Sequence, residues 1–374
     1  SLSVADVVSG TFLPDLAVGR LVETPAEISK TIATFIGQDG VLDLTLRDAA
    51  TGHKVLVTGY DFLTNVAVQI RKGWESALGL PSSFDGTAPL NARLVGGNWG
   101  ISGTPDDLAF RRSALRDALA GTLSGDPTIG PYGILALSGH ATHFEEGVPG
   151  TGATDIQGLP SSGIYGVEPT CGPGNPMPAV DLSGSVIYAV GCHGGLSVPG
   201  SCQTDDDSSL DLPQTFLSRG AVAYVSNTGY GWGLRFGIGY GARLAQIFTE
   251  QLTSATGTMA VGDLLKATKA RYYLEIPRLD AYDQKSLMQW TLFGLPMYAV
   301  KTGTQVVAPR PSDSGGQETL GPVRVTRKVL SGDTEVGGDT TTSALDTSSS
   351  SSAGLRAGSV SALGLPTGLT QLSL

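Results

Sequence analysis

The sequence predicts an α/β fold with a mostly parallel central sheet and helices on both faces. Short apolar runs bounded by glycine recur before residue 305, and such runs are typical of strands buried on both faces of a parallel sheet. Stretches with helical periodicity lie between these runs. Strands that alternate with helices indicate crossover connections, in which each helix packs against the sheet.

The first half of the chain supplies two buried strands and two helices. The apolar run Lys54–Gly59 ends in glycine and predicts a strand, and Asn65–Trp74 predicts the helix that follows it. Pro105–Leu123 predicts a second helix, since its first turn holds two aspartates, which interact favourably with the N-terminal end of a helix. The run Ile134–Leu137 predicts the next strand.

The second half repeats this alternation. Val186–Val190 is apolar and β-rich and is followed by glycine, so it predicts a buried strand. Leu212–Arg219 predicts a helix, and the apolar run Gly220–Ser226 predicts the strand after it. Tyr240–Leu252 and Val261–Tyr273 are amphipathic and predict two further helices.

A long segment rich in glycine and proline, Gly147–Asp181, separates the strands expected at residues 134 and 186. Loops of this length without secondary structure are usually functional or disordered. We therefore expect this segment to be a loop beside an active site.

The composition changes near residue 305. The Ser/Thr-rich, low-complexity sequence beyond it, which includes Ser348–Ser352, buries too little apolar surface to offset the entropy lost on ordering. Only Gly321–Leu330 alternates in the manner of a strand. We expect one folded domain over residues 1–304 and a Ser/Thr/Gly-rich linker or tail over residues 305–374.

Charge and cysteine content limit the partners and the setting. The net charge of −10 and the pI near 4.8 argue against nucleic acid or an anionic membrane as the main partner. No apolar run approaches the roughly 18 residues that span a bilayer. Cys171 and Cys202 flank Cys192, so the chain has either one disulfide, which suits an extracellular setting, or three reduced thiols.

Two of the expected strands end in chemically reactive side chains. The run Tyr188-Ala-Val-Gly leads to Cys192, and the run Leu135-Ala-Leu-Ser-Gly leads to His140. Ligands of open α/β sheets bind at the carboxyl ends of the strands. If the two strands are neighbours, a thiol and an imidazole lie side by side, as nucleophilic cysteine chemistry requires.

Each of these two residues has alternative interpretations. A lone cysteine is commonly a buried structural residue, but Cys192 follows its strand and precedes His-Gly-Gly, which does not pack as core. His143 is the second candidate for the base, whereas His53 lies in a loop-like turn and His193 adjoins the nucleophile. A zinc site formed by three histidines and Cys192 is disfavoured, because no Cys-x-x-Cys pair accompanies them.

Two further features follow the candidate nucleophile. Trp232 lies in a glycine-rich segment after an expected strand, where it either borders a substrate pocket or packs between loop and helix. The acidic cluster of Asp205–Asp207 and Asp211 is a solvated loop, a calcium site or a negative pocket edge for basic substrates. Arg235, close to Trp232, would instead favour acidic substrates.

These segments together resemble the gingipain family of cysteine peptidases, in the clan that also holds caspases and legumains. The clan is marked by a hydrophobic strand ending in His-Gly and a second ending in Ala/Gly-Cys, as in Leu135–His140 and Tyr188–Cys192. Ala141 stands where the family usually has glycine, and Leu295 replaces the aspartate of a closing turn. Four further segments match in order and spacing: Pro14–Arg20, Phe216–Ser226, Trp232–Gly233 and Leu292–Pro296.

The resemblance implies a caspase-like α/β sandwich whose residues 1–304 form a cysteine peptidase catalytic domain. Cys192 is then the nucleophile and His140 the base and proton donor. The family often has an acidic residue that orients the histidine, for which Asp61 is the first candidate and Asp85 the second. Four positions are expected to contact substrate: Gly139, Ala141, Gly191 and Trp232.

The resemblance also implies cleavage of peptide bonds in peptide or protein substrates, with a preference for basic residues before the cut. This chemistry requires no cofactor, and calcium is a candidate structural ion. We expect a secreted or cell-surface protein. The competing interpretation is a catalytically silent caspase-fold module with a role in secretion or as a scaffold.

Overall fold

The computed structural model describes most of the first 303 residues. The chain divides into two units, Ser1–Val306 and Val307–Leu374, and all described residues lie in the first. The predicted tail over residues 305–374 and most of the predicted helix Pro105–Leu123 therefore lie outside the described residues. The described residues are 13–47, 54–60, 63–78, 92–97, 115–116, 119, 132–149, 156–160, 164, 180–198, 210–234, 237–255 and 257–303.

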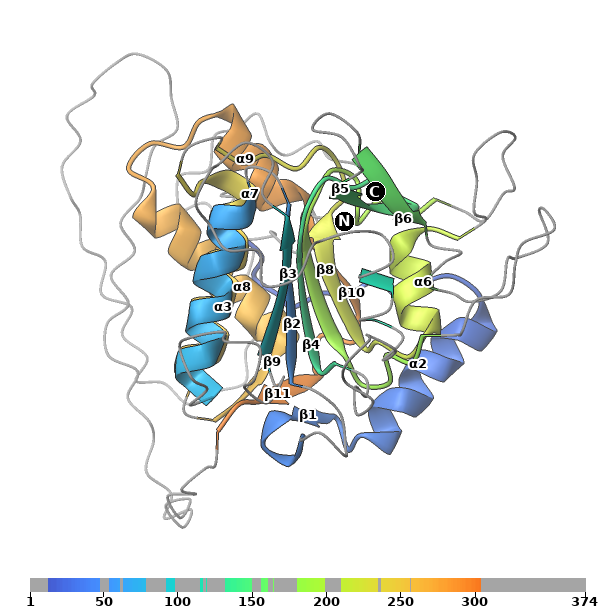
Figure 1. The fold of residues 1–374 in the computed structure, drawn as a ribbon. Coiled ribbons are helices and arrows are strands. Elements are labelled where there is room, and N and C mark those ends of the chain that lie inside the picture. Colours follow the sequence, from blue (N-terminus) through green and yellow to red (C-terminus); the bar gives the residue numbers. More distant parts are fainter. Residues whose placement is uncertain are drawn as a thin grey trace, which may run out of the picture. The chain divides into compact units, whose positions relative to one another are not determined.

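A six-stranded sheet with the order β10-β8-β7-β4-β2-β3 forms the centre of the first unit (Figure 1). Strand β10 runs antiparallel to β8, and the other four pairings are parallel. The predicted α/β fold with a mostly parallel sheet is confirmed. The strands are β2 (Val55–Tyr60), β3 (Ala92–Gly97), β4 (Ile134–Ser138), β7 (Val186–Val190), β8 (Ala223–Asn227) and β10 (Trp290–Gly294).

The central strands are apolar throughout because both of their faces are buried. All five residues of β4 are buried, as are all five of β7. Alternate side chains enter different cores: Ile134 and Ala136 lie in one hydrophobic cluster, whereas Leu135 and Leu137 lie in the other. The two-residue period of a strand sends neighbouring side chains to opposite faces, so a sheet covered on both sides needs apolar residues at every position.

Helices cover both faces of this sheet, as predicted (Figure 1). One face carries α3 (Thr64–Leu78), α7 (Tyr240–Ser254) and α8 (Val261–Glu275), each close to the range expected from the sequence. The opposite face carries α6 (Leu212–Ser218), which was expected, and α2 (Pro25–Gly37), which was not. No helix among the described residues is long and apolar enough to cross a bilayer.

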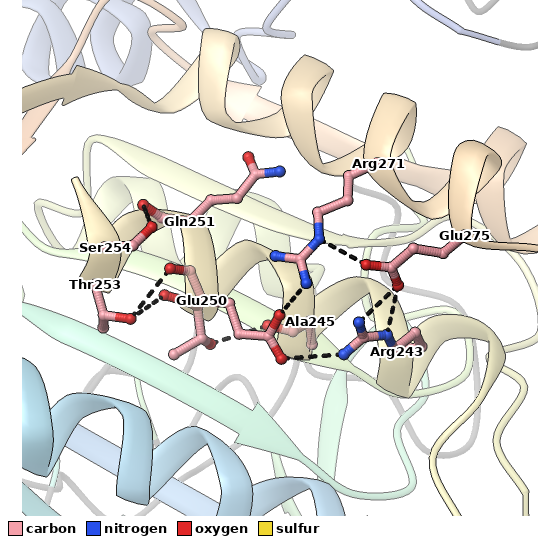
Figure 2. A network of polar contacts seen from close by, with 9 residues as sticks. Arg243, Ala245, Glu250, Gln251, Thr253, Ser254, Arg271 and Glu275 are labelled. Carbon is pink, nitrogen blue, oxygen red and sulfur yellow. Dashed lines mark hydrogen bonds and ion pairs between the residues drawn. The ribbon is translucent and has the colours of Figure 1, made fainter.

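A network of four charged residues links α7 to α8 (Figure 2). Arg243 on α7 contacts Glu250 at 3.0 Å and Glu275 at 2.6 Å, and Arg271 on α8 contacts the same two carboxylates at 2.6 Å each. Every charge in this set therefore has two partners of opposite sign. The network joins the two helices at their partly exposed surface.

Several elements were not expected from the sequence. A three-stranded sheet with the order β1-β11-β9 is built from strands of three residues each. Helix α9 (Ala281–Gln289) precedes the edge strand β10. The strands of the small sheet are β1 (Val41–Asp43), β9 (Thr258–Ala260) and β11 (Ala299–Lys301), and the 3-10 helix η1 (Leu44–Leu46) directly follows β1.

The segment Gly147–Asp181 is not without secondary structure, and that prediction was wrong. Strands β5 (Glu145–Pro149) and β6 (Ile156–Pro160) pair as an antiparallel hairpin that includes the start of this segment. The pairing satisfies backbone hydrogen-bonding groups of both strands, although the segment is rich in glycine and proline. The first strand of the hairpin is bonded to the segment after β4, since the Gly147 N–H donates to the His140 carbonyl at 2.6 Å.

Candidate functional site

Strands β4 and β7 are direct neighbours and pair in parallel, as the candidate site requires. Their last residues, Ser138 and Val190, are partners in the pairing. His140 and Cys192 each lie two residues beyond these partners. The two candidate catalytic residues therefore follow equivalent positions at the carboxyl edge of the sheet.

The turns that carry these residues pack directly against each other. The Gly139 N–H donates to the Val190 carbonyl at 3.1 Å. A Cβ added to Gly191 would lie only 2.6 Å from the Ala141 Cβ, so no larger residue fits there without movement. The structure thus brings together five of the predicted positions, Gly139, His140, Ala141, Gly191 and Cys192, and His140 and Cys192 are both partly exposed.

Strand β8 supports the turn of Cys192 from the other side. Asn227, its last residue, donates its side-chain N–H to the Gly191 carbonyl at 3.1 Å and accepts from the Gly195 N–H with its backbone carbonyl at 2.7 Å. Sequence reasoning missed Asn227. The signal was available, because a polar residue ends a buried strand here just as His140 and Cys192 follow theirs.

The Cys192 thiol is free and partly exposed. Its Sγ lies 3.7 Å from the Gly231 carbonyl oxygen, to which it donates a weak hydrogen bond. His193 follows with φ of 58°, in the left-handed region that is uncommon for a residue with a side chain. Such a backbone conformation turns the chain sharply just after the thiol, and strained residues of this kind often cluster at functional sites.

The other described histidines occupy different surroundings. The His193 ring packs edge-on against Tyr230 with centroids 4.5 Å apart, and the His143 ring packs likewise against Phe144 at 4.6 Å. Within the described residues, no group of three or more His, Cys, Asp or Glu side chains is placed to hold a metal ion. The three histidines and Cys192 therefore do not gather as the zinc interpretation would need.

Trp232 lies in an aromatic cluster after β8. Its ring centroid is 4.5 Å from that of Tyr282 on α9 and 6.5 Å from that of Tyr230. The Lys285 ammonium lies 5.9 Å from the Trp232 centroid. Trp232 thus packs between its loop and a helix, which was one of the two interpretations, and its role at a substrate pocket remains a prediction.

The interpretation of Asp211 as part of a solvated acidic loop was wrong. Asp211 is 4% exposed and is the N-cap residue of α6. Desolvation by burial raises the pKa of Asp211 to about 6, against the effect of backbone hydrogen bonds from Gln214 and Val198. Several predicted residues lie outside the described ones: Asp61, Asp85, Cys171, Cys202, Asp205–Asp207, Arg235 and His53.

Glu146 is a second buried carboxyl near the site, and sequence reasoning missed it. It is 1% exposed, and neither carboxyl oxygen has a hydrogen-bond partner among the described residues. Burial raises the pKa of Glu146 to about 8. Glu146 forms an isolated β-bridge with Ala141, beside a hydrogen bond from the Gly147 N–H to the His140 carbonyl at 2.6 Å. No sequence signal distinguishes it from its neighbour Glu145.

One protein-family model matches part of the chain. Residues 185–301 match the model of Peptidase family C25. This region is gingipain-like. The gingipain-like region begins just before β7 and contains Cys192 and Trp232, and it ends at the last residue of β11. This match confirms the predicted resemblance of this part of the chain to the gingipain family.

Solved structures similar to the chain include gingipains at low sequence identity. The Arg-specific cysteine proteinase gingipain R shares 12% identity at a TM-score of 0.48, over 80% of this chain and 58% of that one. The complex of the RgpB pro- and mature domains of Porphyromonas gingivalis shares 13% identity at a TM-score of 0.46, over 80% and 60%. The Saccharomyces cerevisiae separase–securin complex shares 11% identity at a TM-score of 0.39, over 77% and 14%.

The chain covers 60% or less of the length of these three structures. A sequence comparison with curated proteins finds no match.

Proposed function

We propose that this chain is a cysteine endopeptidase that hydrolyses peptide bonds through Cys192 and His140. The Cys192 thiolate attacks the scissile carbonyl carbon, and the C–N bond breaks as His140 donates a proton to the leaving amine. Water then cleaves the thioester and restores the thiol. The observation that carries this proposal is the direct contact between the turns of His140 and Cys192, at the ends of two paired parallel strands.

The oxyanion formed by this attack needs hydrogen-bond donors. Within the described residues, neither the Cys192 nor the Ala141 backbone N–H donates a hydrogen bond. Both N–H groups lie in the two turns that meet at the sheet edge. We assign this pair to the oxyanion hole, which supports attack at the position of the thiol.

A third residue would orient the His140 ring. Asp61 directly follows β2, and β2 pairs in parallel with β4, whose end carries His140. We therefore keep Asp61 as the first candidate and Asp85 as the second. Their side chains lie outside the described residues.

Substrate preference is a separate part of the proposal. We propose cleavage after basic residues, because the chain is acidic and Asp205–Asp207 follow the nucleophile. Asp211 no longer contributes to this argument, since its carboxylate caps α6. A peptide library that varies the residue before the cut tests the preference, and cleavage after Asp or Glu would reject it in favour of a role for Arg235.

The cellular setting and the cofactor requirement are further parts of the proposal. We propose a secreted or cell-surface protein with a Cys171–Cys202 disulfide and no required cofactor, for which calcium is a candidate structural ion. The mass of the intact protein with and without reduction, after alkylation of free thiols, tests the disulfide.

The experiment that tests the activity compares the wild type with Cys192→Ala. We expect the wild type to cleave a mixed peptide library and to be labelled at Cys192 by an irreversible thiol-directed peptidyl inhibitor. The Cys192→Ala variant should lose activity by several orders of magnitude and unfold at the same urea concentration, since the thiol lies beyond the strand and not in the core. A variant that cleaves at the wild-type rate would refute the assignment of the nucleophile.

A wild type that neither cleaves peptides nor reacts with the inhibitor would favour the silent secretion or scaffold module.

A further inference from the structure

The Asp211 carboxylate accepts hydrogen bonds from two separate parts of the fold. Oδ1 accepts a hydrogen bond from the Gln214 N–H at 2.8 Å and thereby caps the first turn of α6. Oδ2 accepts from the Val198 N–H, also at 2.8 Å. Val198 lies six residues after Cys192, so the second bond fixes the far end of the segment that carries the nucleophile.

The same helix start also holds the segment that follows His140. The Leu212 N–H, the first of α6, donates to the His143 carbonyl at 2.7 Å. The first N–H groups of a helix have no partner within the helix, so this one is free to bind a loop. Asp211 and Leu212 are adjacent, and through them α6 is bonded to both candidate catalytic segments.

The bond from Asp211 completes the support of the nucleophile segment. Towards β8, that segment is held by the His193 N–H, which donates to Gly229, and by the Gly195 N–H, which donates to Asn227. On the side that faces α6, the segment is held by the hydrogen bond that the Val198 N–H donates to Asp211. Asp211 is 4% exposed, and a buried carboxylate is costly unless it is hydrogen-bonded. Its two N–H partners partly offset that cost in this geometry, which favours one position of the segment.

We propose that Asp211 is a positioning residue that holds the Cys192 and His140 segments in register through the start of α6. This inference rests on the proposed function. Asp211 acts by fixing the backbone that carries the thiol and the imidazole. An error of about 1 Å in such positioning lowers activity by roughly a hundredfold.

Two substitutions separate this role from helix capping. Asn and Ser both cap helices well, so Asp211→Asn and Asp211→Ser retain an acceptor for the Gln214 N–H. Neither supplies a second anionic oxygen to Val198, and the amide of Asn places an N–H donor against the Val198 N–H. The matched control is Asp43→Asn. Asp43 caps η1 through the Thr45 N–H at 2.9 Å and pairs with Lys301 at 2.6 Å.

The control lies at the other end of the sheet. The side chain of Leu44, in η1, contacts Gly133, which precedes the first residue of β4. His140 follows the last residue of β4. Asp43→Asn therefore removes the charge of another helix-capping aspartate without touching either candidate catalytic segment.

The first measurement is the steady-state cleavage of a peptide substrate by the full chain. We expect the two Asp211 variants to lose about tenfold or more in kcat with KM within about twofold, because substrate contacts remain while the thiol and imidazole are misaligned. Asp43→Asn should keep the wild-type kcat. Urea unfolding of all variants shows whether they are folded.

The second measurement does not need peptidase activity. The rate at which iodoacetamide alkylates Cys192 at about pH 7 depends on the fraction of thiolate, which a neighbouring imidazole increases. Mass spectrometry of the peptide that contains Cys192 follows this thiol alone. We expect Asp211→Asn to alkylate about tenfold more slowly than the wild type and Asp43→Asn to match it.

Folded Asp211 variants with wild-type kcat and wild-type alkylation rates would overturn this proposal and leave the proposed function intact. A wild type without peptidase activity, together with slow alkylation of the Asp211 variants, would overturn the proposed function and support the positioning role. If Asp211→Asn fails to fold, Asp211→Ser provides the same comparison.

Discussion

Replacing Glu146 with glutamine should make the protein more stable, and increasingly so as the pH rises. Glu146 is buried, and its carboxyl oxygens have no hydrogen-bond partner among the described residues. Burial raises its pKa from 4.5 to about 8. Glutamine has a similar shape and stays neutral at every pH, so it imitates the protonated acid.

The magnitude follows from the difference between the two pKa values. Each pKa unit corresponds to about 1.4 kcal/mol, so a rise from 4.5 to about 8 corresponds to about 5 kcal/mol. Below pH 4.5 the side chain is protonated in both the folded and the unfolded state, so its ionisation makes no difference to stability. Between pH 4.5 and 8 only the unfolded chain ionises, and the stability due to this group is lost by about 1.4 kcal/mol per pH unit.

Urea unfolding at about pH 5, 7 and 9 tests this prediction, in a Cys192→Ala background that avoids self-cleavage. The free energy of unfolding of Glu146→Gln should exceed that of its parent by less than about 1 kcal/mol at pH 5, by about 3 kcal/mol at pH 7 and by about 5 kcal/mol at pH 9. The control is Glu145→Gln, the half-buried neighbour on β5, which should show a small difference with little dependence on pH. A Glu146→Gln difference that stays constant from pH 5 to 9 would refute the burial of an acid at this position.

Three further predictions follow from the site and its supports. His140→Ala should slow the alkylation of Cys192 at neutral pH far more than His143→Ala, and the opposite order would exchange their roles. Gly191→Ala should lower kcat by about tenfold or more while the protein remains folded. The new Cβ would lie 2.6 Å from the Ala141 Cβ and would push the two turns apart. An unchanged kcat would contradict this packing. Arg271→Ala should lower the free energy of unfolding by about 1 kcal/mol, and by less at high salt. Urea unfolding at two salt concentrations measures this loss. Equal losses at both concentrations would argue against an ionic contribution.

The strands that carry the site could be predicted because burial on both faces is visible in local composition. An unbroken, β-rich apolar run bounded by glycine, such as Ile134–Leu137 or Val186–Val190, is typical of a strand that contacts two cores. The short strands β1, β9 and β11 leave no such signal. Each has three residues, and β1 pairs with β11 although Val41 and Ala299 lie far apart in the chain. Their pairing depends on the packing of the whole domain.

The sequence also predicted that His140 and Cys192 follow strands at one sheet edge, since parallel strands end at the same edge. It could not establish that β4 and β7 are neighbours, because strand order depends on how the helices pack across the sheet. The Asp-rich sequence around Asp211 suggested solvated loop, yet its carboxylate is buried. Its hydrogen-bond partner Val198 lies thirteen residues away, in a contact that only the folded chain creates.

The sequence by itself therefore determined the class of fold and placed the candidate pair, Cys192 and His140, directly after two strands, because strand periodicity and the residues after each strand are local properties. The tertiary structure alone decided which polar groups are buried and what holds the turns that carry His140 and Cys192. Glu145 and Glu146 show the difference: the two are chemically identical neighbours, and only the pairing of β5 above the sheet edge makes one a buried acid and leaves the other partly exposed. Burial depends on contacts between distant segments, and adjacent residues of a strand point to opposite sides.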